Sequence, residues 1–154
     1  MINRPTRFTL SAVALLALSG CSTTAGAASD AGGMIEIAVS ETCTDVSDSQ
    51  CVSVNGTTVL IPAAFEEAGV TEATVAENDQ SAVDVTFTAD GAEVLHALTE
   101  EAAGAGESAR LVIRIGGELR AAVVVMEALT GDQAQIALTP EADAQELVDL
   151  IQAG

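Results

Sequence analysis

Few residue patterns in this sequence of 154 residues could support catalysis. His96 is the single histidine, and it lies between Glu93 and Glu100 on what we expect to be the polar face of a helix, where an exposed imidazole is the ordinary outcome. The segment 106–110 approaches the G-x-S-x-G nucleophile motif but lacks its closing glycine. Neither a G-x-G-x-x-G nor a Walker pattern occurs, so nothing indicates a nucleotide site. The sequence therefore predicts a protein that is not an enzyme and that uses no cofactor.

The first of the three cysteines follows a segment with the features of an export signal. Arg4 and Arg7 precede an apolar run of eleven residues, 8–18. This run is too short to cross a bilayer as a helix, which takes about 20 residues, and it is typical of a secretory signal peptide. The tetrapeptide L-S-G-C at 18–21 resembles the lipobox of bacterial lipoproteins, in which a peptidase cuts before the cysteine. An ordinary signal peptide followed by an unrelated cysteine is the alternative.

The lipobox resemblance implies that residues 1–20 are removed as a signal peptide and that Cys21 carries fatty acyl chains such as palmitate. Two or three acyl chains on one residue give durable membrane anchoring. Residues 21–33, rich in Gly, Ala, Ser and Thr, would then form a lipidated, flexible tether with a reach of roughly 20 Å. Residues 34–154 would form a single domain. We therefore expect an extracytoplasmic protein that is anchored to the cell membrane by lipid.

Cys43 and Cys51 remain as an even pair, and an exported protein meets an oxidising compartment. The segment between them is rich in turn-forming residues, so we predict a disulfide that stabilises the fold by about 2–3 kcal/mol. A metal site is the alternative, but the sequence offers these cysteines no further thiol or imidazole ligands apart from His96. Acidic pairs such as Glu66 and Glu67 lack the spacing and the glycine of an EF-hand loop, so we predict no metal site.

The charge of the chain is strongly negative. It contains 23 acidic residues, five arginines and no lysine, for a net charge of −18, and without residues 1–20 the net charge becomes −20. Such a surface repels phosphate groups, so nucleic acid is excluded as a partner. The remaining positive charges are Arg110, Arg114 and Arg120, which are candidates for contact with a partner. The alternative is that they pair with acidic residues of the same chain.

Apolar periodicity predicts both strands and helices. Alternation predicts strands over 35–39, 71–77, 83–88, 111–115, 119–125 and 133–138, and the Asn55-Gly56 turn predicts a hairpin of 52–54 with 59–61. We expect a helical turn at 64–68 and a helix that starts at Thr88 or Asp90 and ends at Gly104 or Gly106. A second helix is expected to begin at Thr139-Pro140. This order predicts an α+β fold in which two main helices cover one face of a largely antiparallel sheet.

Four segments within 83–154 resemble the periplasmic head domain of SecD and fused SecDF, accessory subunits of bacterial protein export. They are T-A-D-G-A-E at 88–93 with L-T at 98–99, the hairpin at 111–122, E-A-L-T-G at 127–131, and L-T-P-E-A at 138–142 with the helix that follows it. Weaker similarity extends back toward Ile35. The chain has Gly116-Gly117 where the family has Asp-Gly, and Val123 where it has Pro.

The resemblance implies a head-like fold and a surface that contacts polypeptides. It does not imply translocase activity, because we expect none of the family's membrane helices and their acidic residues here. We therefore expect a lipid-anchored, non-catalytic domain that binds exported polypeptides or envelope proteins, in protein export or envelope assembly, through the hairpin 110–125 and its sheet edge. The alternatives are a small-ligand-binding lipoprotein, an envelope enzyme whose site the sequence does not reveal, and a structural surface lipoprotein.

Overall fold

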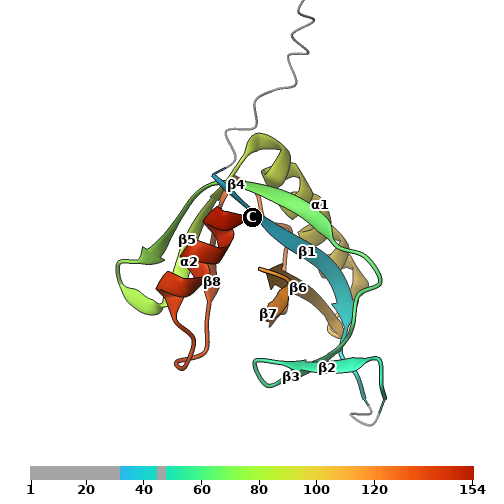
Figure 1. Ribbon diagram of the computed structural model, residues 1–154. Coiled ribbons are helices and arrows are strands. Elements are labelled where there is room, and N and C mark those ends of the chain that lie inside the picture. Colours follow the sequence, from blue (N-terminus) through green and yellow to red (C-terminus); the bar gives the residue numbers. More distant parts are fainter. Residues whose placement is uncertain (1–31, 45–47) are drawn as a thin grey trace, which may run out of the picture.

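The computed structural model describes residues 32–44 and 48–154 (Figure 1). Cys21 and the rest of residues 1–31 lie outside this part of the chain, so the predicted signal peptide, lipid anchor and most of the tether stay predictions. Within it, the elements are β1 (Gly33–Glu41), β2 (Cys51–Val54), β3 (Thr57–Leu60), β4 (Glu66–Ala76), β5 (Asp79–Phe87), α1 (Ala89–Ala105), β6 (Ala109–Ile115), β7 (Glu118–Val123), β8 (Gln133–Ala137) and α2 (Ala144–Ala153).

Six of these strands form one curled sheet in the order β7-β6-β1-β4-β5-β8 (Figure 1). Every neighbouring pair in it is antiparallel. The strands β2 and β3 form a separate hairpin. The predicted α+β class with a largely antiparallel sheet and two helices is confirmed. Among the described residues, no helix is both long enough and apolar enough to cross a membrane.

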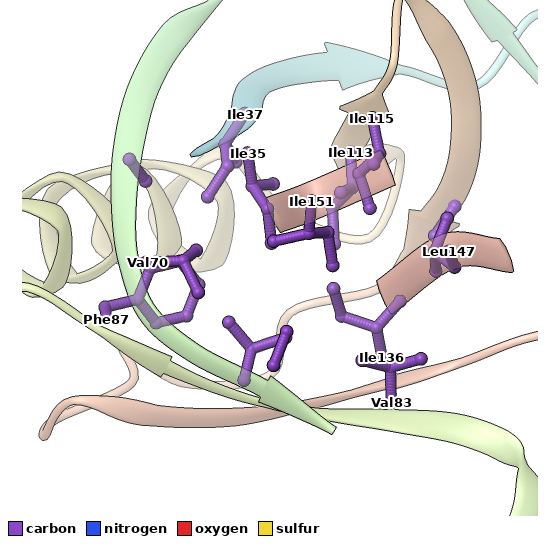
Figure 2. Close-up of a cluster of buried hydrophobic side chains, with 14 of the residues drawn as sticks. Ile35, Ile37, Val70, Val83, Phe87, Ile113, Ile115, Ile136, Leu147 and Ile151 are labelled. Carbon is purple, nitrogen blue, oxygen red and sulfur yellow. The ribbon is translucent and has the colours of Figure 1, made fainter. Parts of the chain in front are cut away.

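One face of the sheet carries the hydrophobic core. Alternate residues of β1, beginning with Ile35 and Ile37, point into it together with residues of β4, β5, β6 and β8 (Figure 2). Both helices cover this face, α1 with Leu95 and Leu98 and α2 with Leu147, Val148 and Ile151. Because aromatic residues are scarce, branched aliphatic side chains fill most of this core.

The start of α1 is close to its predicted position. The Thr88 side chain caps the helix, since its Oγ1 accepts a hydrogen bond from the N–H of Gly91 at 3.0 Å. Gly106, at a positive φ of 96°, ends it. Gly91 lies directly against the backbone of Gly69 in β4, where an added Cβ would come within 2.3 Å of the Gly69 carbonyl oxygen. The missing side chain therefore permits the close packing of α1 on β4.

The helical turn expected at 64–68 is wrong, because β4 begins at Glu66. The segment 66–70 pairs with residues 33–37 of β1. In that register Ala68 lies opposite Ile35 and is fully buried. Ala and Glu favour helices locally, but the pairing of this segment with β1 overrides that preference.

The expected start of α2 at Thr139-Pro140 is also wrong. The helix begins at Ala144, and its N-cap is Asp143, whose carboxylate accepts hydrogen bonds from the N–H groups of Gln145 and Glu146 at 2.9 and 3.3 Å. The chain stays extended through Leu138, whose N–H donates to the Ser81 carbonyl. A turn follows, in which the Thr139 carbonyl accepts a hydrogen bond from the N–H of Ala142. The residue that caps the helix, Asp143, lies after this turn.

The β2–β3 hairpin covers the other face of the sheet over β6 and β7. Val54, Val59 and Val112 form a small second cluster there. Asn55 and Gly56 both have positive φ values, 50° and 81°, as the predicted hairpin turn requires.

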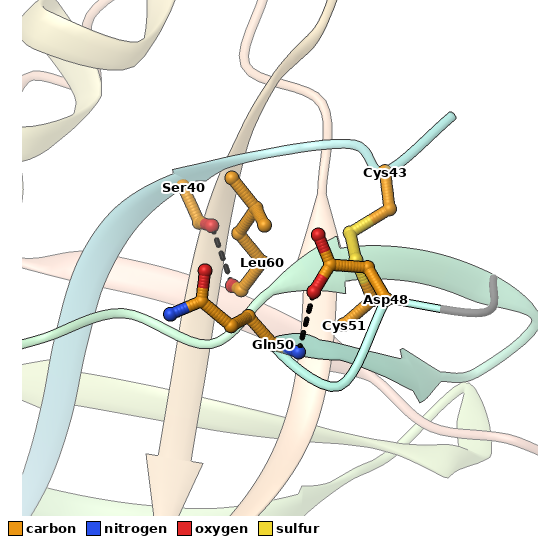
Figure 3. Close-up of a disulfide and its surroundings, with 6 residues drawn as sticks. All are labelled: Ser40, Cys43, Asp48, Gln50, Cys51 and Leu60. Atoms are coloured by element: carbon orange, nitrogen blue, oxygen red, sulfur yellow. Dashed lines mark hydrogen bonds between the residues drawn. A yellow bond between two sulfur atoms is a disulfide. The ribbon is translucent and has the colours of Figure 1, made fainter. Parts of the chain in front are cut away.

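A disulfide between Cys43 and Cys51 joins the end of β1 to the start of β2 (Figure 3). The Ser40 hydroxyl also donates to the Leu60 carbonyl at 2.6 Å (Figure 3). The disulfide predicted from the sequence is thus present. Together these links fix the hairpin to the sheet.

Candidate functional site

The two ends of the sheet, β7 and β8, are its open edges. In the described chain β7 pairs only with β6, and β8 pairs only with β5. An unpaired strand edge presents a row of backbone N–H and C=O groups that can accept another extended chain. The edge at β7 belongs to the hairpin that the sequence indicated as the contact region.

The register determines which backbone groups these edges present. In an antiparallel pair, alternate residues direct their N–H and C=O toward the partner strand and the residues between them direct theirs away. Because the N–H of Leu138 bonds to Ser81 and the N–H of Phe87 bonds to Asp132, the even-numbered residues of β8 face β5. The odd-numbered residues of β8 therefore offer their backbone groups outward. They are Gln133, Gln135 and Ala137.

The edge of β7 is open over only part of its length. Arg120 is the extra residue of a β-bulge opposite Ile113 and Arg114, and its carbonyl accepts a hydrogen bond from the Asn55 amide at 2.8 Å. The hairpin turn therefore closes the first half of this edge. By the alternation of the β6–β7 register, Ala122 is the next residue that presents its backbone groups outward.

Exposed large apolar side chains gather just after this open part of β7. Four of the five such residues in the described chain are Val123, Val124, Met126 and Leu129, which we call the apolar segment. Met126 is 87% exposed. Apolar residues that follow one another on the surface of a highly charged protein mark a contact surface more often than scattered ones do.

Two side chains of α1 hold Leu129, the last residue of the apolar segment. The N–H of Leu129 donates to the Thr99 Oγ1 at 2.9 Å, and the Nδ1 of His96 donates to the Leu129 carbonyl at 2.9 Å. Thr99 is fully buried, and its hydroxyl also bonds to the carbonyl of Leu95. His96, which the sequence presented as an unlikely general base, thus holds a loop. Thr99 belongs to the L-T pair of the family resemblance, but its role in holding Leu129 was not predicted, because a threonine inside a helix carries no local signal of a distant partner.

The arginines proposed as partner contacts do not form one cluster. Arg114 makes a two-point contact with Glu36, with its Nε 2.7 Å from Oε2 and its Nη2 close to Oε1, and its guanidinium lies 3.9 Å from the centre of the Phe65 ring. The hydrogen bond from Arg114 lowers the pKa of Glu36, against a partial desolvation that raises it, and the positive charge of Arg114 lowers it further. Arg114 is therefore largely engaged within the chain.

Arg110 and Arg120 also have partners in the chain. The guanidinium of Arg110 donates to the carbonyls of Glu107 and Ala109, each at 2.7 Å. Arg120 pairs with the exposed Glu118 at 2.9 Å. Arg120 lines a pocket of about 300 Å³ between β7, the Asn55 turn and α2, where acidic residues such as Glu146 also lie. Of the three arginines, Arg120 has the weakest tie and lies nearest to the open edge.

Clusters of metal ligands are not found: no group of three or more His, Cys, Asp or Glu side chains comes together within residues 32–44 and 48–154. Cys43 and Cys51 are joined to each other. What the described residues do offer is unpaired backbone at the sheet edges and exposed apolar side chains.

Comparison with known families identifies the domain. The family model of the SecDF P1 head subdomain matches residues 40–154, about three quarters of the chain. The chain belongs to this family. No curated protein and no solved structure matches the chain. The match confirms the resemblance drawn from 83–154 and extends it over the disulfide-linked hairpin and β4.

Membership of the SecDF head family has two consequences. It associates this domain with an accessory factor of protein export and with contact to polypeptides. It also indicates a location outside the cytoplasm, because the head subdomain of SecDF is periplasmic. The disulfide between Cys43 and Cys51 agrees with that location, since disulfides persist in oxidising compartments.

Proposed function

We propose that this SecDF head-like domain is a non-catalytic binding module, anchored to the membrane through a lipidated Cys21, which contacts exported polypeptides or envelope proteins. The observation that carries the proposal is the open end of the sheet edge at β7, which runs on into the exposed apolar segment beginning at Val123. Backbone pairing at such an edge gives affinity to any extended chain, while the adjacent apolar side chains add contact area. This suits a protein that must accept many sequences.

The charge of the domain supports the choice of partner. At −18 overall, the chain attracts basic segments and repels acidic ones, so binding should weaken as salt rises. A shortage of aromatic residues argues against a receptor for sugars or heterocycles, which bind on stacking surfaces. The lipid anchor would keep the module at the membrane surface, where exported chains emerge.

Site-specific photo-cross-linking in cells tests this function. A photoreactive amino acid at position 126, in the apolar segment, should cross-link to polypeptides, because Met126 is 87% exposed beside the open edge. Position 61 is the matched control, since Ile61 is also an exposed aliphatic residue, at 53%, but lies next to β3. Equal cross-linking from both positions would argue against a specific surface. Absence of polypeptide adducts, together with turnover of a small substrate by the purified domain, would replace this function by an enzymatic one.

A further inference from the structure

A small apolar cavity lies between the two open edges of the sheet. Its volume is about 150 Å³, and it is lined by Val123 at the end of β7, by Ala134, Gln135, Ile136 and Ala137 of β8, and by core residues. The core residues include Phe87, Leu95 and Ile113. Leu129 of the apolar segment also lines it. The cavity thus connects the hydrophobic core with the surface on which the free backbone groups lie.

The size and lining of this cavity indicate what it can hold. Apolar cavities of about 150 Å³ stay dry and can take up a group of the size of benzene. An empty cavity of this kind destabilises the core, because the side chains that line it lack van der Waals contacts on one side. A side chain that enters the cavity restores these contacts. One phenylalanine or leucine side chain from another molecule therefore fits the space.

The edge beside the cavity is better suited to pairing on β8 than on β7. On β8 the outward N–H and C=O groups belong to Gln133, Gln135 and Ala137, an uninterrupted row. On β7 the bulge and the Asn55 amide occupy the first half, so that Ala122 remains. A strand that pairs with β8 would place alternate side chains toward the cavity, because side chains of a strand alternate between the faces of its sheet.

The charges near this edge select the partner further. Asp84 on β5 accepts a hydrogen bond from the Gln135 side chain, Asp132 directly precedes β8, and Glu127 lies in the loop between the two edges. Arg110 and Arg114 are engaged with groups of their own chain. The edge therefore favours positive side chains. A second copy of this chain, which carries the same large negative charge, and an anionic membrane surface are both disfavoured.

The β8 edge, the end of β7 and the apolar cavity between them are together called the cleft. We infer that this cleft binds an extended, positively charged polypeptide segment, which pairs with the β8 edge and inserts one large apolar side chain into the cavity. This inference rests on the proposed binding of polypeptides and specifies its site and the chemistry of the segment. It moves the main contact from the β6–β7 hairpin to β8. It also gives a role to the apolar cavity that lies beside the unpaired edge of β8.

The test uses a fluorescently labelled nine-residue peptide as probe, with alternating lysines on one face and valines around a central phenylalanine on the other. Binding to the domain is measured by anisotropy at low and high salt. Replacing the peptide's phenylalanine by alanine should weaken binding about tenfold or more, since an aromatic group leaves an apolar cavity. Replacing its lysines by glutamate should abolish binding. Raising the salt should weaken the binding of the original peptide.

Variants of the domain locate the site. Gln135→Pro removes an outward N–H that is not used within the sheet. It should weaken the affinity of the domain for the peptide by about threefold to tenfold. Gln135→Ala is its matched control, because it removes the same side chain and keeps the N–H. Ala134→Leu fills the cavity and should abolish the advantage of phenylalanine over alanine in the peptide. Far-UV circular dichroism shows whether each variant is folded, and if Gln135→Pro is not, the Ala134→Leu comparison decides.

The outcomes separate this inference from the proposed function. Weakening by Gln135→Pro but not by Gln135→Ala, with loss of phenylalanine selectivity in Ala134→Leu, supports the cleft. Equal binding of the peptide by all variants overturns the cleft and leaves polypeptide binding in place. If the peptide does not bind while position 126 still cross-links to polypeptides in cells, the cleft is again overturned and the function stands. If the peptide does not bind and position 126 does not cross-link to polypeptides, both the cleft and the proposed function are wrong.

Discussion

The packing of α1 on β4 depends on Gly91, and replacing it by alanine gives a sharp test of the structure. Alanine normally stabilises a helix relative to glycine by up to about 1 kcal/mol. At position 91, however, the new Cβ would lie 2.3 Å from the carbonyl oxygen and 2.9 Å from the amide nitrogen of Gly69. Both are backbone atoms of a central strand, so they cannot move aside as the end of a flexible side chain could.

The magnitude follows from this distance. Carbon and oxygen atoms in close contact are ordinarily about 3.3 Å apart, so the start of α1 must move by about 1 Å. That shift disturbs the N–H of Thr88, which bonds to the Gly69 carbonyl at 2.9 Å, and the Thr88 cap on Gly91 itself. Overpacking of this kind costs about 1–3 kcal/mol, and loss of the cap adds about 1 kcal/mol. Gly91→Ala should therefore destabilise the domain by about 2–3 kcal/mol, despite its better helix propensity.

Gly104→Ala in the last turn of the same helix is the matched control. An added Cβ at position 104 meets no atom within 4 Å, so only the propensity term acts and the variant should be slightly more stable than the wild type. Urea unfolding followed by far-UV circular dichroism measures both, because the chain contains no Trp or Tyr for fluorescence. With a slope of about 1–3 kcal/mol per molar urea, a loss of about 2–3 kcal/mol should lower the midpoint by about 0.7–3 M. An unchanged or raised midpoint would refute the close approach of α1 to β4.

Three further predictions concern the cysteines and the ion pair. Replacing Cys43 and Cys51 together by alanine should lower the free energy of unfolding by about 2–3 kcal/mol, measured by urea unfolding, and an unchanged midpoint would contradict the role of the disulfide. Because Arg114 lowers the pKa of Glu36 below its ordinary value of 4.5, the pair stabilises the fold at neutral pH and this contribution is lost as the pH falls through the lowered pKa. Urea midpoints of wild type and Glu36→Gln should therefore differ at neutral pH and converge in acid, whereas a constant gap would exclude this linkage. Cys21→Ala should leave an unprocessed precursor outside the membrane fraction, and a processed, acylated variant would exclude lipidation at Cys21.

The parts of the fold that could be predicted from sequence are those with local causes. The Asn55-Gly56 turn has positive φ values at both residues, which few other dipeptides adopt, so the β2–β3 hairpin was visible in the sequence. The Thr88 cap and Gly106 marked the two ends of α1 in the same way. In these cases the residue that determines the structure lies next to the structure that it determines.

The parts that were missed depend on contacts between distant segments. Residues 64–68 have the composition of a helix, but residues 66–70 pair with β1 and form the start of a strand instead. The two bonds that hold Leu129 join residues about 30 positions apart, Thr99 and His96 in α1. The bond from Asn55 to the Arg120 carbonyl spans 65 positions. Such contacts depend on the assembled fold, and no local sequence pattern predicts them.

The difference between the two sheet edges connects stability with function. Open edges invite pairing between copies of a protein, and natural proteins protect them with bulges, charges or covering segments. Here the start of β7 has a bulge and the Asn55 amide, and the net charge of −18 keeps copies apart. The edge of β8 has neither bulge nor cover in the described chain, and it adjoins the apolar cavity. Only the negative charge of the domain keeps other copies of this chain from pairing with β8. Because this charge does not repel a basic polypeptide, the β8 edge stays available to the partner that we propose.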